Sequence, residues 1–516
     1  MSIKSRHLPI FILLIISLLI GIFTFQDYGM TWDEYLYYQY ADSIGYAYSI
    51  PERMSEDYDI NLAYGPSAGD HRNRGPAYLL IARIPVNTLH ALTDIDKVAL
   101  WHLMNFITFL LGVFYLYKLA LRWLKPESAF GAALLFLSQP LFWGHAFINP
   151  KDPPFMTLFI ITLYYGFDLV DQLSATDGSK KTSALWKQII LVGILIGLAT
   201  NLRIIAPLLA MLLIFYAVLK GKPKILVWFI PIAFVAIPTT YLTWPYLWDA
   251  PIERFIEVLT LMSNNPTKLK VLFYGNLYRA YELPRRYLPV LLGIKLTEPT
   301  WLLFIIGSIV IFFRIIKKTV DFQSLLVLNF LFYFMLAYVL AMRPPMYDGF
   351  RHFLFILPPI FIVAGFAFEE LFTWVRATWL QAAIFIIILA FGLSSSIKLH
   401  PYEYTYYNAF VGGTSEVEGI YETDYWLTCY KEAIEEFSRL STREETLIVH
   451  REAANAAYYA PEHINIIEYR PVEAGDYLLL SARLNELNTV IQHFPYNIIE
   501  IKRDGATFCV IKEITP

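Results

Sequence analysis

The sequence predicts a polytopic α-helical membrane protein with a small α/β domain outside the membrane at its C-terminal end. Three observations support this prediction. Of the 516 residues, 57% are hydrophobic and only 16% are charged, whereas soluble proteins carry about 25% charged residues. Long apolar segments recur through residues 1–396, and short alternating segments follow them. The net charge of −3 indicates no particular partner, and the sequence has no basic patch typical of nucleic-acid binding.

A membrane-spanning helix requires about 20 mainly apolar residues. Hydropathy predicts about eleven such helices. They lie at residues 8–25, 98–119, 129–147, 155–170, 188–202, 204–219, 225–241, 301–313, 325–341, 353–372 and 379–395. No small-x-small cleavage site follows residues 8–25, so we expect an uncleaved membrane helix there rather than a signal peptide. The two segments beside Arg203 form either two helices or one long broken helix.

Basic residues in the short loops predict the orientation of the chain, because such loops carry more Lys and Arg on the cytoplasmic side. With the N-terminus inside, the inner loops contain Lys118, Arg122, Lys125, Lys180, Lys181, Lys187, Lys220, Lys222, Lys224, Arg314, Lys317, Lys318 and Arg376. The outer side then receives residues 26–97, residues 244–299 and residues 397–516. We therefore expect a multi-pass protein of a bacterial plasma membrane, with a transmembrane domain at 1–396 and an extracytoplasmic domain at 397–516.

The outer segments contain further predicted structure. Apolar residues at helical spacing near Tyr35, near Tyr78 and at residues 252–262 predict helices that lie along the membrane surface. In the C-terminal domain we expect helices at 429–438 and 481–487, and strands at 447–450, 464–469, 477–481, 498–502 and 509–511. Asp504-Gly505 is a typical hairpin turn between the last two strands.

Several classes of site find no support in the sequence. The histidines show no metal-binding spacing such as H-x-x-x-H. The chain lacks a P-loop, a GxGxxG loop and a G-x-S-x-G motif, so ATP-driven transport and serine hydrolysis are unsupported. The two cysteines, Cys429 and Cys509, lie in the segment predicted to be outside, where a disulfide is permitted but nothing in the sequence requires it.

Acidic residues follow two of the predicted helices on the same predicted side. Asp33 and Glu34 come shortly after the first helix, and Asp152 lies in the short loop 149–154. One interpretation is a pair of helix caps, with Thr31 or Asp33 as one cap and Asp152 as the other. The second is a general base that takes a proton from an acceptor hydroxyl or amine, with a neighbouring acid orienting the acceptor or binding a cation. Because both loops lie outside, we expect the acids to converge.

Basic residues gather on the same predicted side. They are Arg72, Arg74, Lys151, Arg203, Arg343, Arg351 and His352. Such residues at helix ends often extend toward lipid headgroups. Alternatively, their alternation with acids around one site suits a phosphate leaving group, because arginine forks bind phosphate oxygens and stabilise developing charge. Arg203, between two apolar segments, is the most costly of them to place without a partner.

Two stretches rich in aromatic and amide side chains, residues 400–408 and 421–426, follow the last predicted helix. One interpretation is a packed junction between the membrane domain and the outer domain, since aromatic residues gather at membrane interfaces. The other is a wall that binds a sugar or the acceptor. The candidate residues for such a wall are Tyr347, Tyr404, Glu422, Asp424 and Trp426.

These motifs resemble the GT-C class of membrane glycosyltransferases, in particular the relatives of protein O-mannosyltransferases and of the lipid A aminoarabinose transferase. In those families an acidic pair follows the first helix, as Asp33-Glu34 does here, and a second acid follows the third helix, as Asp152 does. The resemblance implies a polyprenyl-phosphate-linked sugar donor, transfer on the outer face and the first acid as catalytic base. Two departures stand out. Residues 72–76 replace the family's His-x-Pro-Pro type of pattern, and the C-terminal domain is not the β-trefoil of the eukaryotic mannosyltransferases, which weakens the inference to a protein acceptor.

We therefore predict an inverting hexosyl or pentosyl transferase. Asp33 is the expected base, and Glu34 or Asp152 orients an acceptor, which is a lipid, a glycan or a protein. The expected ligands of the donor phosphate are Arg74, Lys151, Arg203, Arg351 and His352. No cofactor is required in this scheme because the leaving group is already an anion, although a divalent cation bound by the acids is an alternative. The rival functions are a transporter or flippase of lipid-linked glycans and a membrane-anchored glycan-binding protein.

Overall fold

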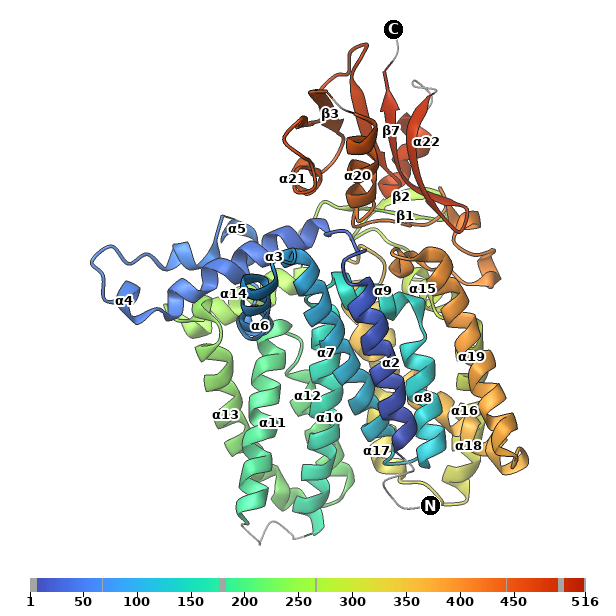
Figure 1. The fold of residues 1–516 in the computed structure, drawn as a ribbon. Helices are drawn as coiled ribbons and strands as arrows, with labels where there is room; N and C mark the ends of the chain where they lie inside the picture. Colours follow the sequence, from blue (N-terminus) through green and yellow to red (C-terminus); the bar gives the residue numbers. More distant parts are fainter. Residues whose placement is uncertain are drawn as a thin grey trace.

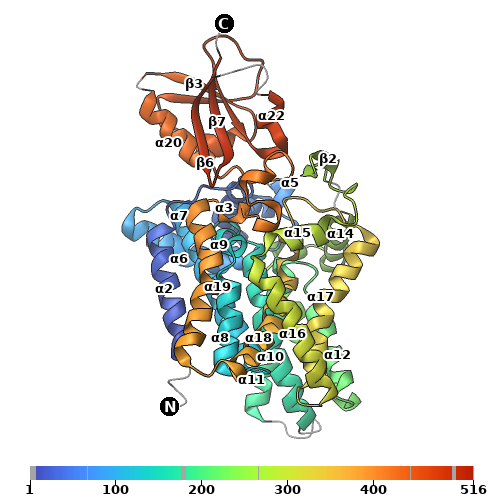
Figure 2. The same cartoon turned by 90° about the vertical axis from the view of Figure 1, so that its right-hand side faces the viewer.

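The computed structural model describes residues 7–66, 68–175, 182–264, 267–441, 443–490 and 496–514. A bundle of long helices carries a small sheet domain at one end, and short helices lie across that end of the bundle, between the two (Figures 1 and 2). The polypeptide therefore divides, as expected, into a helical membrane domain and a C-terminal α/β domain. The loops that carry the predicted site lie where these two parts meet.

Every segment predicted to span the membrane is helical. The helices are α2 (Leu8–Thr24), α7 (Lys97–Ala120), α8 (Pro126–Leu137), α9 (Pro140–Ile148), α10 (Asp152–Ala175), α11 (Ser183–Leu202), α12 (Leu208–Leu219), η3 (Pro223–Trp228), α13 (Phe229–Leu242), α16 (Glu298–Ile316), α17 (Phe322–Met342), η5 (Arg351–Ile356), α18 (Pro358–Trp374) and α19 (Thr378–Leu399). Within the described residues, seven helices are long and apolar enough to cross a membrane, counting Pro223–Leu242 as one. Helices α2 and α12 are apolar but shorter.

Two breaks in the helices have local causes. The segment predicted at 129–147 is two helices, α8 and α9, bent by 64° at Gln139-Pro140. Proline cannot continue the first helix because it lacks the N–H, but it suits the first turn of the next helix. At the other break, Arg203 leaves the helical conformation and α12 starts after Pro207, so α11 and α12 are separate helices.

Several basic residues predicted for the inner loops lie beyond the ends of these helices, whereas Lys118, Lys187 and Arg314 lie within α7, α11 and α16 near their ends. Arg122, just after α7, and Lys220, just after α12, both pair with Asp171 near the end of α10. Lys180 and Lys181 lie outside the described residues. The opposite end of α7 faces the sheet domain, because the Tyr458 hydroxyl donates a hydrogen bond of 2.6 Å to Asp96.

Helices occur at the three places where the sequence predicts surface helices: α3 (Trp32–Ser43), α6 (Ala77–Thr93) and α14 (Pro251–Asn264). Four short helices that were not predicted lie between α3 and α6: η1 (Ile44–Tyr48), α4 (Ile50–Arg53), η2 (Ile60–Tyr64) and α5 (Ala68–His71). Figure 1 shows α3, α6 and α14 across the end of the bundle nearest the sheet domain. They therefore form a roof over the helix ends.

The second long loop also contains structure that the sequence analysis missed. It holds η4 (Pro245–Leu247), β1 (Lys270–Phe273), β2 (Asn276–Arg279) and α15 (Tyr287–Lys295). Strands β1 and β2 form an antiparallel hairpin whose turn, Tyr274-Gly275, has two positive φ angles, as two-residue hairpin turns often require. Phe273 forms a β-bridge with Tyr421, so the hairpin attaches this loop to the junction that precedes the sheet domain.

The C-terminal domain is a five-stranded sheet with helices on it. Its elements are α20 (Tyr430–Leu440), β3 (Glu445–Val449), α21 (Ala453–Ala457), β4 (Ile464–Glu468), β5 (Tyr477–Ser481), η9 (Arg483–Asn485), α22 (Glu486–Val490), β6 (Asn497–Arg503) and β7 (Ala506–Glu513). The strand order is β4-β3-β5-β7-β6. Strand β3 is parallel to β4 and β5, and β7 is antiparallel to β5 and β6. Asp504 and Gly505 form the hairpin turn between β6 and β7 with positive φ angles, as predicted.

Candidate active site

A cavity of about 540 Å³ lies where the surface helices meet the loops at the ends of the bundle. It is lined by segments far apart in the sequence: α3, residues 73–75, the loop before α10, the α11–α12 connection, α14 and residues 344–355. Seven of the residues that the sequence singled out line it. They are Asp33, Arg74, Lys151, Arg203, Tyr347, Arg351 and His352.

Arg351 is the centre of the charge network beside this cavity. Its Nη2 lies 3.1 Å from Asp33 Oδ2 and 3.1 Å from Asp348 Oδ2, and its Nη1 lies 3.3 Å from Asp152 Oδ2. Burial alone would lower the pKa of Arg351, but these three carboxylates outweigh burial and raise the pKa well above its usual range. The guanidinium therefore stays charged and links three acids that come from separate segments.

Asp33 is the partly exposed carboxylate of this network. Its side chain retains 21% of its accessibility, whereas those of Asp152 and Asp348 retain 3% and 0%. It lies in the first turn of α3, where the unpaired backbone N–H groups favour a negative charge. Asp33 is thus placed to meet a molecule in the cavity.

Asp152 lies behind the arginines and does not line the cavity. The Asn149 side chain accepts hydrogen bonds from the backbone N–H groups of Lys151 (3.1 Å) and Asp152 (2.9 Å) and donates one to Asp152 Oδ2 (2.9 Å). The other oxygen of Asp152 pairs with Arg203. The structure therefore places Asp152 where it orients Arg203 and Arg351, rather than where it would contact an acceptor.

Glu34 points away from the cavity although it neighbours Asp33. It is fully buried and forms a capping box: the Thr31 N–H donates to Glu34 Oε2 (2.7 Å), and the Glu34 N–H donates to Thr31 Oγ1 (3.2 Å). The Tyr38 hydroxyl also donates to Glu34 Oε1, and His102 Nε2 lies 3.3 Å from Oε2. The two neighbouring acids therefore have different surroundings. Asp33 lines the cavity, whereas Glu34 fits the helix-cap interpretation, with Thr31 as its partner.

Arg74 and Lys151 meet at Tyr37, which the sequence analysis did not single out. Arg74 Nη1 donates a 2.6 Å hydrogen bond to the Tyr37 hydroxyl, and Lys151 Nζ lies 5.7 Å from the centre of the Tyr37 ring. Burial, reinforced by the charges of Arg203 and Arg74, lowers the pKa of Lys151 well below its usual range. The neighbouring arginines therefore make protonation of Lys151 costly, and an anion in the cavity would lower that cost.

His352 and Tyr347 form another wall of the cavity. Their ring centroids lie 4.9 Å apart, nearly perpendicular. Burial, together with Arg351 and Arg203, lowers the pKa of His352 well below its usual range, so its imidazole is neutral. A neutral imidazole can donate or accept one hydrogen bond, but it adds no charge to a phosphate site.

Four of the residues predicted to form a sugar-binding or acceptor-binding wall lie in the packed junction instead of lining the cavity. Tyr404, Glu422, Asp424 and Trp426 are all buried. Trp426 lies over the Arg351 guanidinium at 5.0 Å from the ring centre, and it therefore covers the back of the charge network. Burial raises the pKa of Glu422 to about 8. Of the five residues proposed for this wall, Tyr347 faces the cavity.

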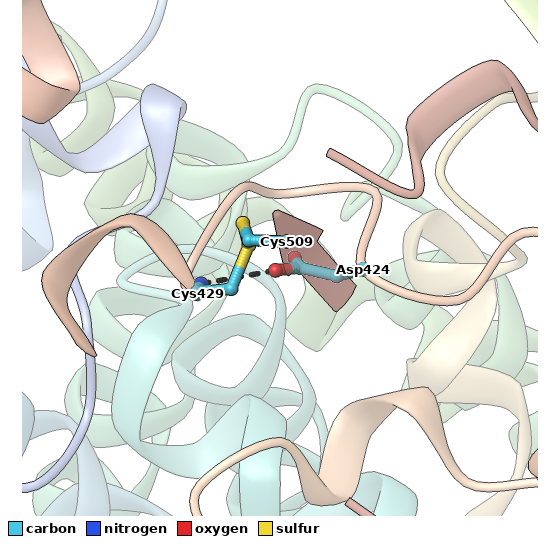
Figure 3. A group of neighbouring side chains, drawn as sticks. All are labelled: Asp424, Cys429 and Cys509. Atoms are coloured by element: carbon cyan, nitrogen blue, oxygen red, sulfur yellow. Dashed lines mark hydrogen bonds between the residues drawn. A yellow bond between two sulfur atoms is a disulfide. The ribbon is translucent and has the colours of Figure 1, made fainter. Parts of the chain in front are cut away.

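Asp424 and the two cysteines form a structural joint. Figure 3 shows Asp424 beside the disulfide between Cys429 and Cys509, whose Cα atoms are 5.9 Å apart. The permitted disulfide is therefore present. Asp424 accepts hydrogen bonds from the backbone N–H groups of residues 426, 428 and 429 and from the Tyr404 hydroxyl. The sulfurs are bonded to each other and the carboxylate is occupied, so this cluster ties the junction to α20 and β7 and offers no ligand set for a metal.

Comparisons with known proteins find a matching family model and similar folds. Residues 89–247 match the family model of dolichyl-phosphate-mannose-protein mannosyltransferases. No curated protein sequence matches the chain. Apo ArnT from Cupriavidus metallidurans has a similar structure, with 11% identity, coverage of 99% of this chain and 98% of ArnT, and a TM-score of 0.53.

Two further structures are similar. One is the same ArnT bound to undecaprenyl phosphate, with 12% identity, 97% coverage of both chains and a TM-score of 0.50. The other is the apo oligosaccharyltransferase of Archaeoglobus fulgidus, with 12% identity, coverage of 94% of this chain and 70% of that one, and a TM-score of 0.52. Since the likeness to ArnT extends over nearly the whole chain, the protein has the fold of the GT-C membrane glycosyltransferases.

Proposed function

We propose that the protein transfers a sugar from a polyprenyl-phosphate-linked donor to an acceptor at the outer face of the membrane, with Asp33 as the general base. The observation that carries this proposal is the cavity itself. There a partly exposed carboxylate lies 3.1 Å from a buried guanidinium and shares the cavity wall with further cationic side chains. One group is suited to accept a proton, and the others are suited to hold an anion.

In the proposed reaction the acceptor oxygen or nitrogen forms a bond to the anomeric carbon of the sugar. The bond from that carbon to the phosphate oxygen breaks, and the phosphate keeps the electron pair. Asp33 takes the acceptor proton, and Arg74, Arg203 and Arg351 stabilise the charge that develops on the phosphate. Attack from the face opposite the phosphate inverts the configuration at the anomeric carbon. No cofactor takes part in this scheme, and a divalent cation at Asp33 is the alternative.

An apolar groove suits the lipid part of such a donor. It has a volume of about 680 Å³, and it lies between α11, α12, α13 and α14. Helix α14 separates the two spaces, because Ile252, Phe255 and Ile256 line the groove while Val258 and Leu261 line the cavity. A polyprenyl chain in the groove would bring its phosphate toward the cavity. The similar fold of ArnT has been seen with undecaprenyl phosphate bound, which supports a donor of this chemical class.

The test is transfer of a labelled sugar from polyprenyl-phosphate donors in membranes that contain the wild type or Asp33→Asn. We expect the variant to lose at least about 100-fold in rate, the usual scale for removing a general base. Asp42→Asn is the matched control: Asp42 lies on the same helix, its side chain is 48% exposed, and it pairs with Lys97. Equal transfer by Asp33→Asn and the wild type at equal protein amounts would refute the assignment of Asp33.

A further inference from the structure

We infer that the C-terminal domain completes the active site through Arg483, a positioning residue that holds Asp348 and Arg351 in place beside Asp33. This inference rests on the proposed function and deepens it, because it gives the outer domain a defined part in the reaction. The contact joins residues 135 positions apart, and it crosses the boundary between the sheet domain and the membrane domain.

Arg483 is buried between the two domains, with 3% of its surface exposed. Its Nη2 lies 3.2 Å from Asp348 Oδ1, and its Nη1 donates to the backbone oxygen of Tyr425. The guanidinium also lies 4.5 Å from the centre of the Trp32 ring. A single guanidinium fork therefore contacts a carboxylate, a backbone carbonyl and an aromatic face, and an ammonium group cannot reproduce that geometry.

These contacts lead directly to the proposed base. Asp348 binds Arg483 through Oδ1 and Arg351 through Oδ2, and Arg351 binds Asp33. Trp32, which packs against Arg483, is the residue before Asp33. Arg483 does not line the cavity, so its effect on the reaction would pass through Asp348 and Trp32. Without Arg483, Asp348 would retain Arg351 as its ion-pair partner and would draw it away from Asp33.

In the outer domain, the edge of the sheet at the carboxyl ends of the parallel strands β3 and β5 faces this network. Arg483 follows the carboxyl end of β5, and residues 450–452 follow the carboxyl end of the parallel strand β3. Loops at the carboxyl ends of parallel strands are the usual binding edge of α/β sheets. Here residues beyond β3 contact the chain just before α3: the Asn455 side chain donates to the Met30 carbonyl (2.9 Å), and the Met30 N–H donates to the Tyr459 hydroxyl (2.8 Å).

The backbone next to Arg483 is unusual. Leu484 and Asn485 both adopt the left-handed conformation, with φ of 55° and 61°. A left-handed leucine is strained, and such strain is retained where the surrounding structure requires a particular direction of the chain. The conformation at this point lets Arg483 reach the membrane domain while α22 stays on the sheet.

The experiment compares Arg483→Met, Arg483→Lys, Asp348→Asn and the double variant Arg483→Met/Asp348→Asn in the transfer assay. Methionine keeps the length of the side chain but removes the fork and the charge. We expect kcat to fall about 100-fold, the effect of a displacement of about 1 Å at a reacting centre, with little change in KM for the donor. Arg483→Lys should restore part of the rate. The double variant should lose less than the product of the single losses, because the two residues act as one unit.

The matched control is Arg470→Met, which breaks an ion pair with Asp476 in the same domain and should leave the rate unchanged. If Arg483→Met does not fold, Arg483→Lys carries the test, since it keeps a charge beside Asp348 but not the fork. Wild-type kcat in Arg483→Met, or in Arg483→Lys where Arg483→Met does not fold, at equal amounts of folded protein, would overturn the inference. The wild-type rate tests the proposed function, whereas the ratio of variant to wild type tests Arg483, so the two failures are distinguishable.

Discussion

Replacing Glu34 with alanine should lower the free energy of unfolding and leave the proposed base, Asp33, in place. Glu34→Ala removes one of the two hydrogen bonds of the capping box, from the Thr31 N–H to Glu34 Oε2, and keeps the one from the residue-34 N–H to Thr31 Oγ1. Losing one such hydrogen bond costs about 0.5–1.5 kcal/mol. The substitution also leaves the buried Tyr38 hydroxyl without its acceptor, which adds about 1–3 kcal/mol. The two losses share one side chain, so we expect a total of about 1–4 kcal/mol, below their simple sum.

The assay is thermal unfolding of the purified protein in detergent, with transfer measured on the folded fraction. Asp33→Asn is the paired variant: it should lose transfer but lower the unfolding temperature less than Glu34→Ala does, because Arg351 keeps Asp152 and Asp348 as partners. Glu34→Ala should keep transfer per folded molecule. The opposite pattern, a stable Glu34→Ala protein without transfer, would show that Glu34 is the base and that the assignment of the two acids is reversed.

Three further predictions concern other parts of the molecule. Arg203→Gln should raise KM for the donor and lower kcat in the transfer assay, because it removes a proposed phosphate ligand and leaves one oxygen of Asp152 unpaired. Cys429→Ser with Cys509→Ser should lower the unfolding free energy of the C-terminal domain by about 2–4 kcal/mol in denaturant titrations, since the disulfide closes a loop of 80 residues. His400 lies between Asp27 and Glu403, which outweigh burial and raise its pKa to about 9. Its contribution to stability is therefore complete below about pH 6.5 and lost as the pH rises to about 9, and unfolding temperatures of His400→Gln should lack this decline.

Much of the architecture could be predicted because it depends on local pattern. Apolar segments predicted the helices, alternation of apolar and polar residues predicted the five strands of the outer domain, and Asp504-Gly505 predicted the turn between the last two strands. The convergence of Asp33, Arg203 and Arg351 follows from placing every second loop on one side of a membrane. The hairpin β1–β2 was missed because its strands have four residues each and carry little alternation.

The different surroundings of the neighbouring acids Asp33 and Glu34 were harder to predict from the sequence. Thr31 and Glu34 have the spacing of a capping box, which is a readable signal, but the sequence does not reveal that Tyr38 and His102 bury the same carboxylate. No sequence pattern pointed to Arg483, because its contacts depend on how the C-terminal domain packs against the membrane domain. Contacts of that kind become visible only when both surfaces are known.

The balance of charge around Arg351 explains why a phosphate-linked donor suits this site. The guanidinium groups of Arg203, Arg351 and Arg483 pair with the carboxylates of Asp33, Asp152 and Asp348, and Arg74 donates to the Tyr37 hydroxyl instead. Two of those carboxylates are buried and permanently occupied by arginines, so they hold the cations in position without neutralising all of them. We expect an anion in the cavity to complete the balance and to weaken the pair between Arg351 and Asp33. The same event that binds the donor would thus make the base available to the acceptor, which is a physical reason for transfer to wait until the donor is in place.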